Sequence, residues 1–265
     1  MTLNAETGAN RGADAVQARS RAPVVLSLIA VMTVATVVLV VNVLIYRARY
    51  LFIQWHPDYV AKQQPTISRA IADPLIGEPF AFWMAVCAPL LFIGVGCIVA
   101  LARRDVRTHA ADDAPLMRRF DRMFALLLLL QVMACVGMVM LSHYRFPDFG
   151  AMHMTGSYIF FFSQGFVVVA GGVLAGLLMR LPGSDERMIL PGMNRLRRRL
   201  TMVPILMAIS YLALFVLKDV PVFQGNKALY QAYVWMEPAV LSSFLIYVGL
   251  FLVDLVIGIW RHWSR

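Results

Sequence analysis

Long runs of apolar residues dominate the chain, and polar residues are largely confined to the stretches between them. A helix needs about 20 consecutive apolar residues to cross the hydrocarbon core of a bilayer. Six runs reach or approach that length. Because no water reaches the backbone at that depth, each run is expected to form a helix. The predicted spans are about 22–46, 80–102, 123–142, 157–179, 200–217 and 236–260.

The stretches outside the spans predict little further structure. Residues 1–21 are small, polar and arginine-containing, which is typical of a disordered cytoplasmic tail. The apolar run that follows is too long for a cleaved signal peptide and favours a signal anchor. Residues 22–260 then form a six-helix transmembrane domain, and residues 261–265 a cytoplasmic C-terminal end. The predicted fold class is an all-α membrane protein, a bundle of six transmembrane helices with a small extracytoplasmic loop cap.

Composition agrees with this architecture. Hydrophobic residues make up 60% of the 265-residue chain and charged residues 15%, against about 45–50% and 25% in soluble domains. These proportions exclude a water-soluble globule, a disordered chain and a disulfide scaffold. Nucleotide-binding, zinc-binding and serine-hydrolase sequence motifs are absent, and the connections are too short for a soluble catalytic domain.

The net charge of +9 is unevenly distributed. Of the 24 Lys and Arg residues, 17 fall on the side of the two chain termini and 7 on the other side. Positive residues accumulate on the cytoplasmic side of a membrane, so both termini are predicted to be cytoplasmic, in the plasma (inner) membrane. No basic segment carries the features of a nucleic-acid site, and the expected partners are membrane lipids.

Polar residues that could carry function gather in the outer connections. The candidates for binding a lipid headgroup or organising the cap are Ser68, His143, His153 and Glu237. Glu237 precedes Pro238 at the expected start of the sixth helix, where its charge would meet the positive helix end. Alternatively, Glu237 faces His153 or His143 and lines a headgroup-sized pocket.

Asp254 lies deeper, within the sixth predicted span, two helical turns before Arg261. Its position near the cytoplasmic end favours snorkelling to the membrane interface. The arginines between positions 195 and 199 are interpreted as a cytoplasmic loop that could also contact anionic headgroups.

Several short motifs resemble those of the FRAG–DRAM–SFK family of six-helix membrane proteins. They are Pro65-Thr66-Ile67-Ser68 in a long first outer loop, His153 after an aromatic second outer loop, and an acidic residue, Glu237, at the opening of the last helix. One position departs from the pattern, since Pro238 follows Glu237 where the family commonly has Trp. The family includes damage-regulated autophagy modulators, a factor in remodelling of GPI-anchored proteins and yeast relatives linked to phospholipid organisation. The resemblance implies a role in lipid or membrane organisation and provides no established catalytic residues that could be assigned to this chain.

Three functional hypotheses follow. The first is a non-catalytic factor in membrane or lipid organisation that binds a lipid at its outer face, without cofactor or metal. The second is an intramembrane lipid-modifying enzyme with His153 as general base, oriented or assisted by Glu237. The third is a b-type haem or quinone protein with His143 and His153 as axial ligands.

Overall fold

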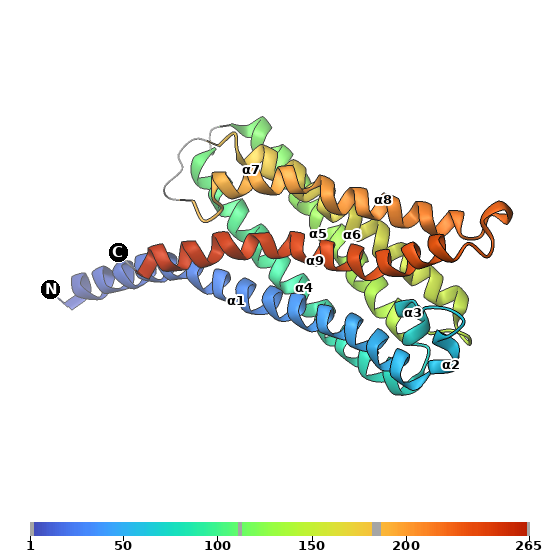
Figure 1. Ribbon diagram of the computed structural model, residues 1–265. Helices are drawn as coiled ribbons and strands as arrows, with labels where there is room; N and C mark the ends of the chain where they lie inside the picture. Colours follow the sequence, from blue (N-terminus) through green and yellow to red (C-terminus); the bar gives the residue numbers. More distant parts are fainter. Residues whose placement is uncertain (1–2, 111–112, 182–186, 264–265) are drawn as a thin grey trace.

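Six helices of the described residues are long and apolar enough to cross a membrane, which confirms the predicted fold class (Figure 1). The computed structural model describes the backbone of residues 3–110, 113–181 and 187–263, and the side chains of residues 22–110, 113–181 and 187–261. The long helices are α1 (Leu3–Trp55), α4 (Pro74–His109), α5 (Ala114–His143), α6 (Gly150–Leu178), the pair α7 (Pro191–Leu200) and α8 (Met202–Leu217), and α9 (Lys227–Trp263). Three short elements complete the fold: α2 (Pro57–Val60), α3 (Ile67–Ala70) and a 3-10 turn, η1 (Pro221–Phe223).

Most of the helices extend beyond the apolar runs that predict them. The second predicted span, 80–102, lies inside the longer helix α4. Helices leave the hydrocarbon core and continue as polar turns, so an apolar run defines only their middle part. The sixth predicted span, 236–260, also starts too late, because α9 already begins at Lys227. Pro238 therefore lies inside α9 and does not open it.

Side-chain caps explain where several helices begin. Asp73 caps α4 by accepting a hydrogen bond from the backbone N–H of Leu75 at 2.9 Å, with Pro74 in the first position. Asp113 caps α5 in the same way through Leu116 N at 2.9 Å. These carboxylates satisfy N–H groups that have no partner within the helix.

The bundle has two distinct ends. We call one the cap end; it carries α2, α3, residues 144–149 and residues 218–226 (Figure 1). The other, the tail end, carries both chain termini. Successive long helices pack side by side, and α9 returns to pack against α1. The arrangement brings segments from both halves of the chain together at the cap end.

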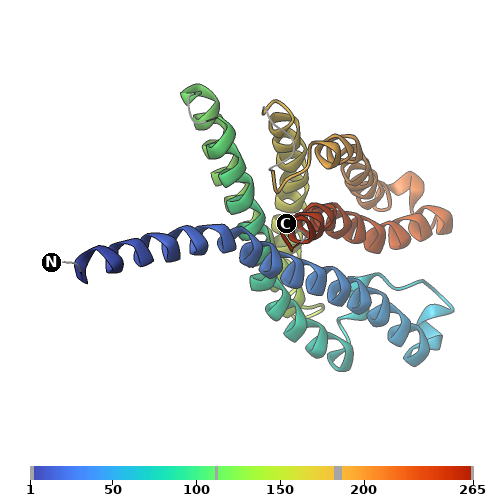
Figure 2. The same cartoon turned by 90° about the vertical axis from the view of Figure 1, so that its left-hand side faces the viewer.

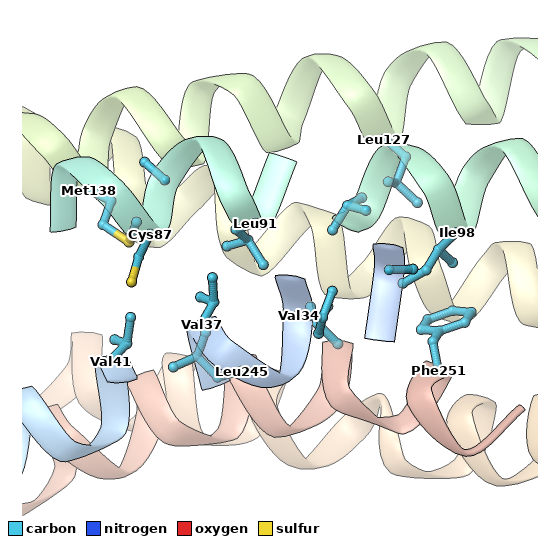
Figure 3. Close-up of a cluster of buried hydrophobic side chains, with 14 of the residues drawn as sticks. Val34, Val37, Val41, Cys87, Leu91, Ile98, Leu127, Met138, Leu245 and Phe251 are labelled. Atoms are coloured by element: carbon cyan, nitrogen blue, oxygen red, sulfur yellow. The ribbon is translucent and has the colours of Figure 1, made fainter. Parts of the chain in front are cut away.

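The largest buried cluster lies between α1, α4, α5 and α9. In Figure 3, valines of α1 face apolar side chains of α4, and side chains from α5 and α9 complete the contact. Helix α8 differs from the other spans because little of it is buried and it packs mainly against α9. The residues labelled in this cluster are Val34, Val37, Val41, Cys87, Leu91, Ile98, Leu127, Met138, Leu245 and Phe251.

The tail end corrects one interpretation. Asp254 does not snorkel: its side chain and that of Arg197 are both fully buried and form an ion pair. Asp254 Oδ1 also accepts a hydrogen bond from Leu190 N at 3.1 Å. Asp105 of α4 holds the same segment by accepting from Ile189 N at 2.9 Å. The segment before α7 is thus fastened to α4 and α9 by buried carboxylates, and Arg197 does not face the lipid headgroups.

Helix α1 is drawn as one helix from Leu3 (Figure 2), whereas the sequence predicts a disordered tail over residues 1–21. Residues 1–2 and the side chains of residues 3–21 lie outside the described part of the chain. The disordered tail therefore stays a prediction. Most of the C-terminal end, residues 261–265, also lies outside the described side chains.

Candidate functional site

The segment between α1 and α4 places Ser68 at the cap end. Thr66 caps the short helix α3 by accepting a hydrogen bond from Arg69 N at 3.0 Å. Ile67 and Ile71 are 4% and 1% exposed and anchor α3 in the bundle. Ser68 lies between these two buried isoleucines in the sequence. It is therefore held in place, half-buried, where the cap end meets the bundle.

Glu237 reaches the same point from α9. The carboxylate is 4% exposed. Its Oε2 accepts a hydrogen bond from Ile67 N at 2.6 Å, and its Oε1 lies 3.4 Å from Ser68 Oγ. Because α9 begins at Lys227, Glu237 lies within the helix and does not cap it. Both of these contacts are with α3. The alternative interpretation placed Glu237 opposite His153 or His143, whereas the structure brings Glu237 and His153 to the same hydroxyl, Ser68 Oγ, at 3.4 Å and 3.0 Å.

His153 arrives from the first turn of α6 and is 1% exposed. Its Nδ1 lies 2.9 Å from the carbonyl oxygen of Tyr144, and its Nε2 lies 3.0 Å from Ser68 Oγ. A carbonyl oxygen only accepts hydrogen bonds, so Nδ1 carries the proton. In the neutral imidazole, Nε2 then has a lone pair that accepts the hydrogen bond from the Ser68 hydroxyl.

Arg49 of α1 is a member of the site that the sequence analysis missed. It is 4% exposed, its Nε donates to the Pro65 carbonyl at 3.2 Å, and its guanidinium lies 4.6 Å from the ring centroid of Trp235. Its positive charge also acts on Glu237. The sequence did contain a signal for Arg49, because it is a cationic residue next to a long apolar run. Ionisable groups at membrane depth are costly and have partners.

The three polar side chains lie at one end of an apolar cavity of about 250 Å³. Phe162 and Phe166 of α6 and Ile209 of α8 line this cavity, and each is at least half exposed on the surface of the bundle. The cavity therefore opens sideways between α6 and α8, in the region that faces lipid. A second cavity of about 50 Å³ lies behind Ser68 and Glu237, toward the main core.

His143 does not join this group. It ends α5, where its Nδ1 lies 2.9 Å from the Val139 carbonyl oxygen of its own helix. Both nitrogens of His153 are already hydrogen-bonded to protein groups, so the two histidines do not face a common site as a haem would require. Among the described residues, no cluster of three or more His, Cys, Asp or Glu side chains could hold a metal ion.

The structure thus brings together three of the four predicted site residues, Ser68, His153 and Glu237. The comparison with protein-family models matches residues 21–257 to the Frag1/DRAM/Sfk1/Cwh43P N-terminal domain. Neither curated proteins nor solved structures give a significant match. The family match includes all six membrane-spanning helices and every residue of the site. The chain belongs to the Frag1/DRAM/Sfk1 family of multi-pass membrane proteins.

Proposed function

We propose that the protein binds a membrane lipid at its cap end and takes part there in membrane or lipid organisation. The observation that carries the proposal is the meeting of Ser68, His153 and Glu237 at one end of an apolar cavity that opens sideways between α6 and α8. The cavity has a polar end and an apolar wall, and a membrane lipid likewise has a polar headgroup region and apolar acyl chains.

The apolar wall suits an acyl chain. Aromatic and aliphatic side chains of α6 and α8 form most of it, so an acyl chain that leaves the bilayer for this wall stays in apolar surroundings. The polar end suits the glycerol, ester or headgroup region, because hydroxyl, imidazole and carboxylate groups offer both donors and acceptors. Tyr211 and Tyr233, stacked at 5.4 Å between ring centroids, add two hydroxyl groups to the wall.

The distribution of charges supports a proposed orientation. The excess of positive residues at the tail end supports cytoplasmic termini, with the cap end on the outer side of the plasma membrane. The bound lipid would then come from the outer leaflet, because the cavity opens near the cap end.

The test fills the cavity without disturbing the polar groups. A Cβ atom added at Gly165, which lines the cavity, meets nothing within 4 Å, so Gly165→Trp can place its ring in the cavity. Gly96 of α4 is an equally open helical glycine that lines none of the cavities described here, and Gly96→Trp is the matched control.

The full chain, purified in mild detergent, is incubated with vesicles of dioleoyl phosphatidylethanolamine and dioleoyl phosphatidylglycerol. Retained lipid is then measured by native mass spectrometry. We expect Gly165→Trp to retain about tenfold less lipid than the unmodified chain, which corresponds to about 1.4 kcal/mol. Gly96→Trp should retain the normal amount. Equal retention by all three proteins, or no retained lipid in any of them, would overturn the proposal.

A further inference from the structure

Ser68 and His153 have the geometry of a nucleophile and its base. A serine hydroxyl is activated when a base lies within hydrogen-bond reach and a third group orients that base. The distance between Ser68 Oγ and His153 Nε2 is 3.0 Å, and the Tyr144 carbonyl holds the other ring nitrogen at 2.9 Å. The three groups therefore form a chain from backbone carbonyl to imidazole to hydroxyl.

The tautomer is the one that a base requires. With the proton on Nδ1, the unprotonated Nε2 points at the Ser68 hydroxyl and can take its proton. The Phe146 ring packs against the imidazole, with 4.9 Å between ring centroids, and helps to fix the plane of the ring.

A nucleophile must be within reach of its substrate, and Ser68 is accessible from the cavity. His153 and Glu237 are almost completely buried, whereas Ser68 is half-buried and lines the cavity proposed to hold lipid. A lipid whose acyl chain lies along α6 and α8 has its ester group at the polar end of the cavity. The ester carbonyl is then the part of the ligand nearest to the hydroxyl.

Glu237 and Arg49 act as positioning residues. Glu237 holds the backbone of α3 through Ile67 N, and Arg49 holds the residue before α3 through the Pro65 carbonyl. Both contacts limit movement of Ser68 relative to His153. Neither side chain needs to touch the reacting ester.

We propose that Ser68 is a nucleophile that takes an acyl group from an ester-linked membrane lipid, with His153 as its base. This inference rests on the lipid binding proposed above. In the first step, Ser68 Oγ bonds to the ester carbonyl carbon and its proton moves to His153 Nε2. The bond from that carbon to the lipid alcohol oxygen then breaks, and the proton passes from Nε2 to the departing alcohol. An acyl ester on Ser68 remains.

The second step releases the acyl group to a hydroxyl compound, either water or the alcohol of a second lipid. His153 Nε2 takes the proton of that hydroxyl as its oxygen bonds to the acyl carbon, and returns the proton to Ser68 Oγ as the acyl–serine bond breaks. Tyr233 lines the same cavity, and its hydroxyl is the proposed donor to the negative charge that develops on the carbonyl oxygen. No oxidant, reductant or metal is consumed.

The first experiment traps the nucleophile. The full chain in lipid nanodiscs is treated with a fluorophosphonate, which forms a covalent adduct with an activated serine and releases fluoride. We expect one adduct, on the peptide that contains Ser68, and none in Ser68→Ala. His153→Gln should slow labelling by about a hundredfold or more. Ser243→Ala is the control, because the Ser243 hydroxyl bonds only within its own helix and lies outside the cavity.

The second experiment follows the acyl group. The same proteins receive phosphatidylethanolamine carrying a ¹⁴C-oleoyl chain, with or without a lysophospholipid as acceptor. We expect hydroxylamine-sensitive label on Ser68, followed by labelled fatty acid if water is the acceptor or labelled diacyl lipid if the lysophospholipid is. Thermal unfolding and retained lipid are measured for every variant, so that misfolding is recognised.

The outcomes separate the two proposals. If the chain retains lipid but is neither labelled by the fluorophosphonate nor acylated, Ser68 is not a nucleophile and the lipid-binding function remains. If the fluorophosphonate still labels the Ser68→Ala protein, the labelled residue is not Ser68 and the inference is wrong. Loss of both adducts in Ser68→Ala, with lipid still retained, supports it. If neither lipid nor label is found on the unmodified chain, both proposals fail.

Discussion

The Oε2 atom of Glu237 accepts a hydrogen bond from the backbone N–H of Ile67 at 2.6 Å, although 170 residues separate the two along the chain. This contact joins α9 to α3 at the cap end. Because the carboxylate is almost fully buried, its hydrogen bonds are not replaced by water when one is lost. The position of α3, and of Ser68 within it, therefore depends on a side chain from the last helix.

Replacing Glu237 should destabilise the cap end. Glu237→Ala leaves the Ile67 N–H without its acceptor, and we expect the free energy of unfolding to fall by about 2–3 kcal/mol. Glu237→Gln should cost less, because its side-chain carbonyl can still accept this hydrogen bond. The measurement is reversible unfolding of each variant in the same detergent. Glu78, an exposed carboxylate of α4, provides the control variant Glu78→Ala, and an equal loss in that variant would contradict the prediction.

The buried ion pair at the tail end should show strong coupling between its members. The side chains of Arg197 and Asp254 are fully shielded from solvent. Arg197→Met therefore leaves an unpaired buried carboxylate, and we expect it to lower the free energy of unfolding by about 3–5 kcal/mol. The double variant Arg197→Met/Asp254→Asn should be more stable than Arg197→Met alone, because no charge remains and the amide oxygen can still accept from Leu190 N. Additive losses in the double variant would show that the two side chains are not coupled.

Gly77 in the first turn of α4 should tolerate no larger residue. A Cβ atom there would lie 2.0 Å from the carbonyl oxygen of Ile71 and 2.3 Å from Arg145 Nη1. Because the nearest obstacle is backbone, we expect Gly77→Ala to lower the unfolding free energy by about 1–3 kcal/mol. Gly96→Ala, with no atom within 4 Å of the new Cβ, should be neutral or stabilising, since alanine favours the helix. A stable Gly77→Ala protein would mean that α3 and α4 are less closely packed.

The orientation can be read from single cysteines. Val222 at the cap end is 85% exposed, and Thr108 at the tail end is also exposed. In intact cells, a membrane-impermeant maleimide should label Val222→Cys and should label Thr108→Cys only after permeabilisation. The unmodified chain is the control, since Cys87, Cys97 and Cys135 all lie within the spans. The reverse labelling pattern would place the cap end in the cytoplasm.

Features that depend only on residues close together along the chain, such as the spans and the start of α4, could be predicted from the sequence. The spans follow from the length of each apolar run, and α4 begins where Asp73 and Pro74 provide a cap and a first helical residue. Pro238 suggested a helix start, but it lies inside α9, because a proline is tolerated in a membrane helix when its neighbours satisfy the freed carbonyl group.

The sequence by itself determined the fold class, the family and the list of polar residues from which the site is built, because apolar run length and short motifs are local properties of the chain. Only the tertiary structure decided that Ser68, His153 and Glu237 meet while His143 stays apart, and that Arg197 is buried against Asp254. The physical reason is distance along the chain. Ser68 lies 85 residues from His153 and 169 from Glu237, and their contacts arise only because α9 packs back against α1 while α3 inserts at the end of the bundle.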